Sequence, residues 1–248
     1  MGTDLSRWQD AQQYERRWWE GVEAGFDFEY LEAFAEEVEH DLKERLAIGP
    51  ETRILEIGGG PAGIVSHMPR AGRRVSIDPL EAYFRRVPSF TAARDPAVEY
   101  LEAEGEHLPF EDASFDLVLM DNVLDHCRKP VRVLKETHRV LAPSGILYLK
   151  QHTFHRWGLF VRRLMELFKI DKGHPQSFSR PTLKSLLARY GWTILHEEHS
   201  GYLPHWLFDL RAPALKNKLK LVLFVTWNTG LYILQKDRAE PAGGEEQR

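Results

Sequence analysis

The chain has 248 residues, of which 43% are hydrophobic and 28% are charged, which is the composition of a globular protein with one large core. Its formal net charge of −4 gives no general attraction to nucleic acid or anionic lipid, and no basic patch stands out in the sequence. A single cysteine, Cys127, excludes an intramolecular disulfide, and the first ten residues lack the apolar core of a signal peptide. We therefore expect a cytoplasmic protein without a transmembrane segment, since the longest nearly apolar run, 219–234, is short and interrupted by polar residues.

Two helices are predicted before the first strand. The first covers residue 5 to about residue 24 and is rich in aromatic residues, including Trp8, Trp18 and Trp19. The second carries apolar residues every three or four positions, at Phe28, Leu31, Ala35, Val38, Leu42 and Leu46, and ends at Gly49-Pro50. We expect residues 1–48 to form a helical lid or flank beside a ligand site, with the tryptophans serving mainly in packing.

The segment RILEIGGGPAG, residues 53–63, places an apolar strand directly before a glycine-rich turn. Glycines at 58 and 60 allow a sharp turn and a close approach of a ligand to the backbone. The spacing serves both nicotinamide dinucleotides and S-adenosylmethionine, and an ordinary strand-to-helix turn is a third interpretation. Glu56 favours S-adenosylmethionine, because a carboxylate suits an α-amino group and a sulfonium better than a pyrophosphate.

Strands and helices then alternate along the chain. We predict strands at 53–57, 74–77, 98–102, 115–120, 146–151, 192–198 and 230–236, with a helix from Pro130 whose face includes Val131, Leu134, His138 and Leu141. This alternation predicts an α/β fold: a Rossmann-like, mostly parallel, seven-stranded sheet with helices on both faces and an antiparallel last strand. Ligands of such sheets bind beyond the carboxyl ends of the strands, where Glu56, Asp78, Glu104, Asp121 and His152 are expected.

This layout also predicts how the chain divides into domains. Residues 49–236 are expected to form the main domain, with helical insertions at about 154–170 and 200–228 and a disordered tail at 237–248. The helix 154–170 carries the basic pair Arg162–Arg163 and a broad apolar face. We expect it to cover the active site, and contact with a membrane surface is the less favoured interpretation.

Four segments together resemble class I S-adenosylmethionine-dependent methyltransferases, closest to the subgroup called methyltransferase type 11. They are EIGGGPAG, the acid in SIDPL, AEGEHLPFEDASFDLVLMDNVLDH and LKETHRVLAPSGILYL, and the resemblance covers about residues 50–152. It implies S-adenosylmethionine as the cofactor. It also implies that the glycine loop holds the methionine part, a role carried here by Glu56, Gly58, Gly59 and Gly60.

The resemblance assigns the remaining cofactor contacts to other strand ends. Asp78, twenty residues after Gly58, matches the acid that binds the ribose hydroxyls, and it also suits a helix N-cap before Pro79. Glu104 and Gly105 match the pair that contacts adenine, and Asp121 matches the wall of the methyl-transfer pocket. The sequence departs from the family at the third glycine, which falls on Ala62, and at Glu104, where a shorter aspartate is usual.

Methyl transfer from a sulfonium is an in-line displacement, so a catalytic base is optional. Candidates for one are His126 after the fourth strand, His152 at the fifth strand and His174 in the segment HPQSFSRPTL. Two histidine pairs, His152–His155 and His196–His199, have helical ligand spacing but no third ligand nearby, so we predict no metal.

The methyl acceptor is expected to be a small or lipid-like molecule and not nucleic acid. The pocket is expected to be lined by apolar side chains. They are Trp18, Trp19, Phe26, Phe28, Trp157, Phe160, Leu164, Phe168, Trp206 and Phe208. Two alternatives stay open at this point: a non-catalytic S-adenosylmethionine-binding or scaffold protein on the same fold, and an NAD(P)-dependent oxidoreductase.

Overall fold

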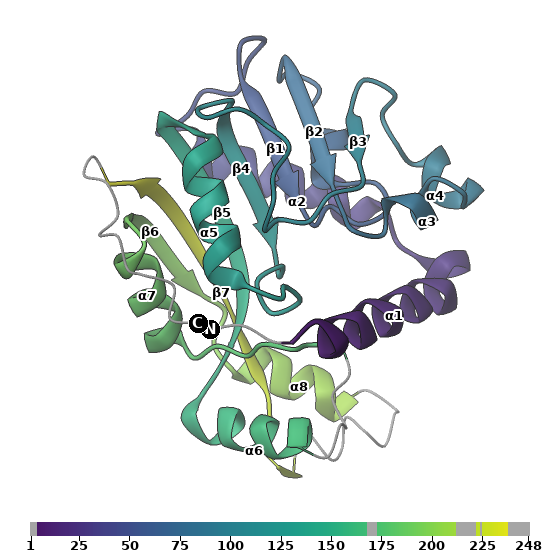
Figure 1. Cartoon of the computed structure of the whole chain (residues 1–248), viewed down its shortest axis with the longest axis vertical. Helices are drawn as coiled ribbons and strands as arrows, with labels where there is room; N and C mark the ends of the chain where they lie inside the picture. The colour runs from purple at the N-terminus through teal and green to yellow at the C-terminus, as the bar shows by residue number, and fades with distance from the viewer. Residues whose placement is uncertain (1–3, 168–172, 212–221, 224, 238–248) are drawn as a thin grey trace.

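Seven strands form one sheet in the computed structural model, which describes residues 4–167, 173–211, 222–223 and 225–237 (Figure 1). In chain order they are β1 Arg53–Ile57, β2 Arg73–Ile77, β3 Glu99–Leu101, β4 Phe115–Asp121, β5 Leu141–Phe154, β6 Trp192–His199 and β7 Trp227–Lys236. The spatial order is β3-β2-β1-β4-β5-β7-β6, and β7 runs antiparallel to both of its neighbours while the other pairs are parallel. The predicted Rossmann-like sheet with an antiparallel last strand is confirmed.

The helices surround this sheet. They are α1 Leu5–Val22, α2 Glu29–Leu42, α3 Glu81–Phe84, α4 Pro88–Ala92, α5 Pro130–Val140, α6 Arg156–Leu167, α7 Arg180–Arg189 and α8 Leu203–Arg211, with short 3₁₀ turns η1 Glu23–Gly25 and η2 Ile64–His67. Predicted boundaries agree to within a few residues for most elements. Ser179 caps α7, since its hydroxyl accepts the N–H of Thr182 at 3.2 Å.

The strands bury alternate residues on opposite faces of the sheet. One face carries Leu55, Ile57, Val118, Met120, Leu147 and Leu149 and packs against α5 and α7. The other carries Ile54, Leu117, Leu119, Ile146 and Tyr148 and packs against α2 and η2. This follows from the two-residue period of a strand, and it gives the domain two cores separated by the sheet.

Helix α2 is one of these covering layers. Its residues Leu31, Ala35, Val38 and Leu42, which form the predicted apolar stripe, are buried in the core beside β1, β4 and β5. Only α1 of the two N-terminal helices stands outside the cores, with Ala11 as its buried residue. The domain boundary at residue 48 stays a prediction, and α2 contributes directly to the main body.

Two local predictions are wrong. The buried face of α5 consists of Val133, Leu134, Thr137 and Val140, so Val131 and His138 lie beside it and not at its centre. The fifth strand, predicted to start at residue 146, already begins at Leu141 directly after α5, and Leu141 pairs with Phe115 before an irregularity in the ladder. At its other end β5 continues to Phe154, which pairs with Trp227, and α6 therefore starts only at Arg156.

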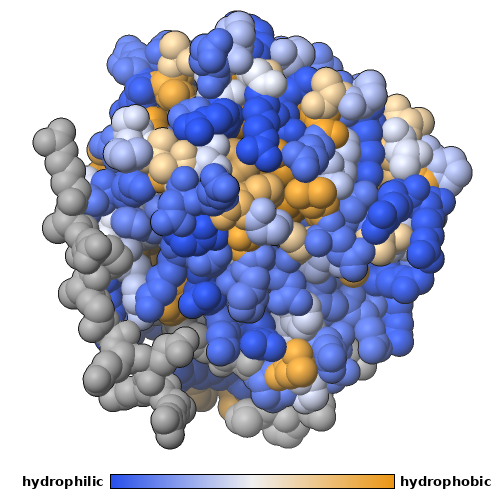
Figure 2. Space-filling view, turned by 45° about the horizontal axis from the view of Figure 1, so that its top comes forward, coloured by the Kyte–Doolittle hydropathy of each residue, from blue (hydrophilic) through white to orange (hydrophobic). Residues whose placement is uncertain are grey.

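Parts of three predictions cannot be compared with the structure. Residues 168–170 of the first insertion, 212–221 and 224 of the second, and 238–248 of the predicted tail lie outside the described residues. Within the described ranges, no helix combines the length and apolar character needed to cross a membrane. The face shown in Figure 2 is mostly hydrophilic and has a compact hydrophobic area near its middle.

The chain order reverses between β1 and β4. From β1 the chain moves outward through β2 to β3, and it returns to the other side of β1 for β4 and β5. Parallel sheets of this kind bind ligands at that point, beyond the carboxyl ends of the two strands. Helix α1 lies along this edge of the molecule, near α3 and α4 (Figure 1).

Candidate active site

A cavity of about 360 Å³ lies where the chain order reverses. It is closed on three sides: by the loop after β1, by the loops after β2 and β3, and by the loop after β4. Helix α1 forms its roof. The lining residues include Ile57, Gly58, Gly60, Asp78, Pro79, Leu80, Ala103, Gly105, Glu106, Asp121, Asn122, Val123, His126 and Cys127, with Trp8, Gln12, Glu15, Trp18 and Trp19 from α1.

The glycine loop after β1 packs closely between the end of β2 and the loop after β4. Gly58 has a φ of +74° and donates its N–H to the carbonyl of Ile77 at 2.8 Å, which ties the loop to the end of β2. A Cβ atom at Gly58 would come within 2.7 Å of a methyl group of Val123. Gly60 also lines the cavity with positive φ, whereas Gly59 does not line it and faces the hydroxyl of Ser76. Position 58 therefore requires glycine, both for its positive φ and for lack of space for a Cβ atom.

Glu56 occupies a different place from the one expected. Its side chain is 3% exposed, does not line the cavity, and accepts the N–H groups of Ile64 at 3.0 Å and Val65 at 3.1 Å. The first N–H groups of a helical turn have no partner within the turn, and Glu56 supplies one for η2. The carboxylate therefore fixes the backbone that follows the glycine loop and does not face the cavity. Burial outweighs the two hydrogen bonds and raises the pKa of Glu56 to about 7.

This placement predicts a pH-dependent effect of Glu56 on stability. Between the ordinary pKa of 4.5 and the folded value of about 7, the folded chain keeps a proton that the unfolded chain loses. The free energy of unfolding should therefore fall as the pH rises through this window. Glu56→Gln should flatten that fall, and it should also cost roughly 1–3 kcal/mol because one backbone N–H then meets the amide NH₂ group. Urea unfolding at several pH values measures both effects.

The matched control is Glu44→Gln, since Glu44 is an exposed glutamate outside the cores. It should reproduce the pH dependence of the unsubstituted protein. If Glu56→Gln keeps the same slope as this control, the buried carboxyl does not hold the extra proton.

Asp78 connects the second strand to the glycine loop. Its two carboxylate oxygens accept the N–H of Gly60 at 3.1 Å and the N–H of Leu80 at 2.8 Å, and the side chain lines the cavity. The bond to Leu80 holds the turn before α3, but the N-cap of α3 is Leu80 and the helix has no side-chain cap, so Asp78 is not the N-cap that the sequence also suggested. Burial raises the pKa of Asp78 to about 6.

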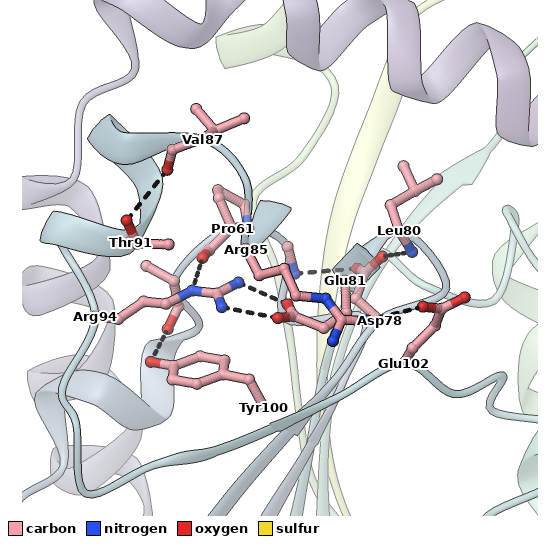
Figure 3. Close-up of polar contacts among 12 residues, drawn as sticks. Pro61, Asp78, Leu80, Glu81, Arg85, Val87, Thr91, Arg94, Tyr100 and Glu102 are labelled. Carbon is pink, nitrogen blue, oxygen red and sulfur yellow. Dashed lines mark hydrogen bonds and ion pairs between the residues drawn. The ribbon is translucent and has the colours of Figure 1, made fainter. Parts of the chain in front are cut away.

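A buried ion pair lies beneath the loops that carry Asp78 and Gly60. Arg94 contacts both oxygens of Glu81 at 2.9 and 2.6 Å and donates its Nε–H to the carbonyl of Pro61 at 2.6 Å. Tyr100 donates its hydroxyl to the carbonyl of Ala62 at 2.9 Å, and the Arg94 guanidinium lies 4.1 Å from the centre of its ring. Figure 3 shows Arg94 between Pro61 and Glu81, so one side chain links the glycine loop to α3.

The pair expected at adenine is divided between two hollows. Gly105 lines the main cavity, where a Cβ atom would come within 3.1 Å of Ile57 and Val133. Glu104 lines an adjoining recess, which shares Trp8, Gln12, Pro79, Leu80 and Ala103 with the cavity. In this segment after β3, the acid that lines the main cavity is Glu106. It is buried and accepts the N–H of Lys129 at 2.9 Å. Sequence analysis missed Glu106, because its burial depends on the loop before α5.

Asp121 ends β4 on the cavity wall. The hydroxyl of Tyr30, on α2, donates to its carboxylate at 3.1 Å, and burial raises the pKa of Asp121. The next residue, Asn122, has a φ of +54° and accepts the Nε2–H of Gln151 and the backbone N–H of His152, both at 3.1 Å. These bonds hold the turn after β4 in shape. Nothing in the sequence near Asp121 indicated Tyr30, which lies 91 residues earlier.

The three candidate histidines have different positions. His126 lines the cavity, and its Nδ1 is 3.7 Å from a carboxylate oxygen of Glu15 on α1. His174 lies against His126, with ring centres 4.7 Å apart. His152 is on β5, does not line the cavity, and has a pKa lowered to about 4 by burial. The pairs His152–His155 and His196–His199 lack helical ligand geometry, because they fall on or beside β5 and β6.

The expected aromatic walls are only partly present. Trp18 and Trp19 line the cavity from α1. Outside it, Phe26 packs with Trp19 and Phe28, and Phe28 packs with Phe90. Trp157, Phe160 and Leu164 of α6 are exposed, and Trp206 does not line the cavity. No described side chain of α6 lines this cavity, since the helix packs against the carboxyl end of β5 and the first residue of β7. Phe168 and the side chain of Phe208 lie outside the described residues.

Comparisons with known proteins agree with this layout. A family model described as a methyltransferase domain matches residues 55–149. An uncharacterized methyltransferase of Mycolicibacterium gilvum is 34% identical over 197 residues, which cover 71% of this chain and 76% of that protein. The sterol 24-C-methyltransferase of Schizosaccharomyces pombe is 24% identical over 201 residues, covering 75% of this chain and 53% of that protein.

Solved structures share the fold. The geranyl diphosphate C-methyltransferase from Streptomyces coelicolor A3(2), in complex with Mg²⁺, geranyl diphosphate and S-adenosyl-L-homocysteine, has a TM-score of 0.60 at 15% identity. The match covers 82% of this chain and 77% of that one. The matched domain and the Mycolicibacterium relative show that the chain belongs to the class I S-adenosylmethionine-dependent methyltransferases and uses S-adenosylmethionine as its cofactor.

Proposed function

We propose that this methyltransferase transfers the methyl group of S-adenosylmethionine to a small or lipid-like acceptor by in-line displacement. The observation that carries the proposal is the cavity at the β1–β4 switch point. It joins the glycine loop and Asp78 to Asp121 and His126, and three tryptophans of α1 line it. A concave, largely apolar cavity with a few polar groups suits a small acceptor better than an extended polymer.

The cavity residues fit the cofactor. Gly58 and Gly60 leave room beside the backbone that a Cβ atom would fill, which suits the methionine part. Asp78 presents a carboxylate for the ribose hydroxyls, and Gly105 with the neighbouring Glu104 forms the adenine end. We assign Asp121 to the methyl-transfer end. Glu56 and Gly59 act as positioning residues, since neither lines the cavity.

Asp78 offers a direct test of this assignment. Asp78→Ala should weaken the binding of S-adenosylhomocysteine by about 1.5–3 kcal/mol, because charge-assisted hydrogen bonds to two hydroxyls are lost. The hydroxyls donate to the ionised carboxylate, whose pKa in the free protein is about 6. Affinity of the unsubstituted protein should therefore fall as the pH drops below 6, and that of Asp78→Ala should change less. Calorimetric titration at pH 5 and pH 8 measures both, and equal affinities of the two proteins would refute the ribose role.

When bound, S-adenosylmethionine would supply an electrophilic methyl carbon, which the acceptor attacks in line while the C–S bond breaks and S-adenosylhomocysteine leaves. The protein's own task is to position the acceptor and exclude water. Trp18 and Trp19 provide the apolar roof, and His126 lies at the cavity wall where it can accept a proton from the acceptor. Cys127 is unsuited as a nucleophile, because burial raises the pKa of its thiol and its S–H donates to the carbonyl of Val123.

The acceptor class follows from the same walls. Trp8, Trp18, Trp19, Leu80 and Val123 present apolar surface around Asp121 and His126. The similar proteins named as methylating a sterol and geranyl diphosphate support an acceptor with a hydrocarbon part. We expect mass spectrometry to find a methylated product when the enzyme is given phenolic, polyketide, quinone and fatty acceptors with labelled cofactor. Robust methylation of tRNA, DNA or a purified protein, with no small acceptor modified, would overturn this proposal.

A further inference from the structure

We propose that Asp125, His126 and His174 form a binding site for one divalent transition-metal ion at the acceptor end of the cavity. One ligand atom from each of these residues lies within 4.8 Å of those of the other two. The three come from separate parts of the chain. Asp125 and His126 follow β4, whereas His174 precedes α7, and the N–H of Gln176 joins the two segments by donating to the carbonyl of Asp125 at 3.1 Å. The inference deepens the proposed function, on which it rests for the role of the ion.

The donor set matches a known coordination chemistry. Two imidazoles and one carboxylate bind Zn²⁺ or Fe²⁺ and leave open positions for water or substrate. Metal–nitrogen bonds are about 2.0–2.1 Å long, so donors on one ion lie roughly 3–4 Å apart. The widest pair here needs to close by about 1 Å, which rotation of the half-buried imidazoles allows. Sequence analysis missed this group because it compared only histidine pairs at helical spacing.

A hydrogen bond orients one of the ligands, and a carboxylate lies near a second. Gln151 is fully buried and donates its Nε2–H to Oδ1 of Asp125 at 2.9 Å. On the other side, Nδ1 of His126 is 3.7 Å from the carboxylate of Glu15 on α1. Metal-bound histidines commonly pair their second ring nitrogen with a carboxylate, and metal-bound carboxylates are commonly hydrogen-bonded in turn. Glu15 and Gln151 stand where such partners are needed if Nε2 of His126 binds the ion.

The position of the site indicates what the ion would do. His126 lines the same cavity as Asp121, so an ion beside it faces the acceptor end. An open coordination position there would bind an oxygen of the acceptor and, for a hydroxyl, lower its pKa by Lewis acidity. The acceptor class that fits is therefore an apolar molecule with an oxygen ligand, such as a phenol, an enol or a carboxylate.

The test measures metal binding directly, on tag-free protein stripped with a chelator. Titration with Zn²⁺ by calorimetry and with Co²⁺ by visible absorption should show one equivalent of tightly bound ion. His174→Gln should weaken the binding constant by more than about 100-fold, since even outer partners of metal sites contribute 10- to 100-fold. Glu15→Gln should weaken it by about 10- to 100-fold. The control His196→Gln, at a partly exposed histidine of β6, should bind like the unsubstituted protein.

Two results would overturn the metal site: absence of stoichiometric binding in the unsubstituted protein, or equal metal affinity in His174→Gln. Thermal unfolding of each variant excludes a general loss of structure as the cause. The same preparations are titrated with S-adenosylhomocysteine, and His174→Gln should keep that affinity. Loss of S-adenosylhomocysteine binding in all proteins would count against the proposed function, whereas loss of metal binding alone in the unsubstituted protein would count only against the ion.

Discussion

Gly58→Val should abolish detectable binding of S-adenosylhomocysteine while leaving the far-ultraviolet circular dichroism largely unchanged. Gly58 has a φ of +74°, which a β-branched residue adopts only under strain. Its Cβ atom would also lie 2.7 Å from a methyl group of Val123, and both residues line the cavity. The added side chain therefore has to move the loop or fill the space meant for the ligand. Calorimetric titration measures the loss.

Gly201→Val separates backbone strain from blockage of the cavity. Gly201 has a φ of +75°, nearly that of Gly58, but a Cβ atom there meets nothing within 4 Å. This variant should lose stability through strain and keep its affinity for S-adenosylhomocysteine. Normal binding by Gly58→Val would show that the glycine loop does not hold the cofactor.

Arg94→Met should lower the free energy of unfolding by about 3–5 kcal/mol, because it leaves Glu81 as an unpaired charge in the interior. The side chains of Arg94 and Glu81 are 9% and 6% exposed, so water cannot replace the lost partner. The substitution also removes the hydrogen bond to the carbonyl of Pro61, which links the glycine loop to α3. Binding of S-adenosylhomocysteine should weaken as well. Urea unfolding and calorimetry measure the two effects.

The double variant Glu81→Leu with Arg94→Met provides the control. Replacement of a whole buried ion pair by apolar residues is often neutral, so this protein should recover most of the lost stability. It should not recover the affinity for S-adenosylhomocysteine, since the bond to Pro61 stays absent. A double variant as unstable as Arg94→Met would mean that packing around Arg94, and not the charge of Glu81, accounts for the loss.

The sheet was predictable because its signals are local. The apolar runs of β1 and β4 and the glycine turn after β1 are readable from a few neighbouring residues, and so is the stripe of α2. The prediction was wrong where packing decides between similar local patterns. Helix α5 buries Val133 and Thr137 in place of Val131 and His138, because the register of the helix on the sheet is set by neighbours that the pattern does not reveal.

The site was predictable only where strand ends determine position. Asp78 and Asp121 line the cavity, as expected from their places at the carboxyl ends of β2 and β4. The role of Glu56 depends on the N–H groups of η2, and the roof depends on how α1 folds back across the sheet edge, which no local pattern specifies. The grouping of His174 with Asp125 likewise arises from a backbone contact between distant segments.

The central claim is that the cavity between β1 and β4, roofed by α1, is the cofactor site. Hydrogen–deuterium exchange with and without S-adenosylhomocysteine tests it most directly, because bound ligand slows exchange of the backbone groups it covers or orders. Protection should concentrate in 57–63, 76–81, 103–107 and 120–127 and extend into α1, the segments that surround the cavity. Saturating ligand that leaves these segments unchanged, or that protects only α6 to β7, would contradict the claim.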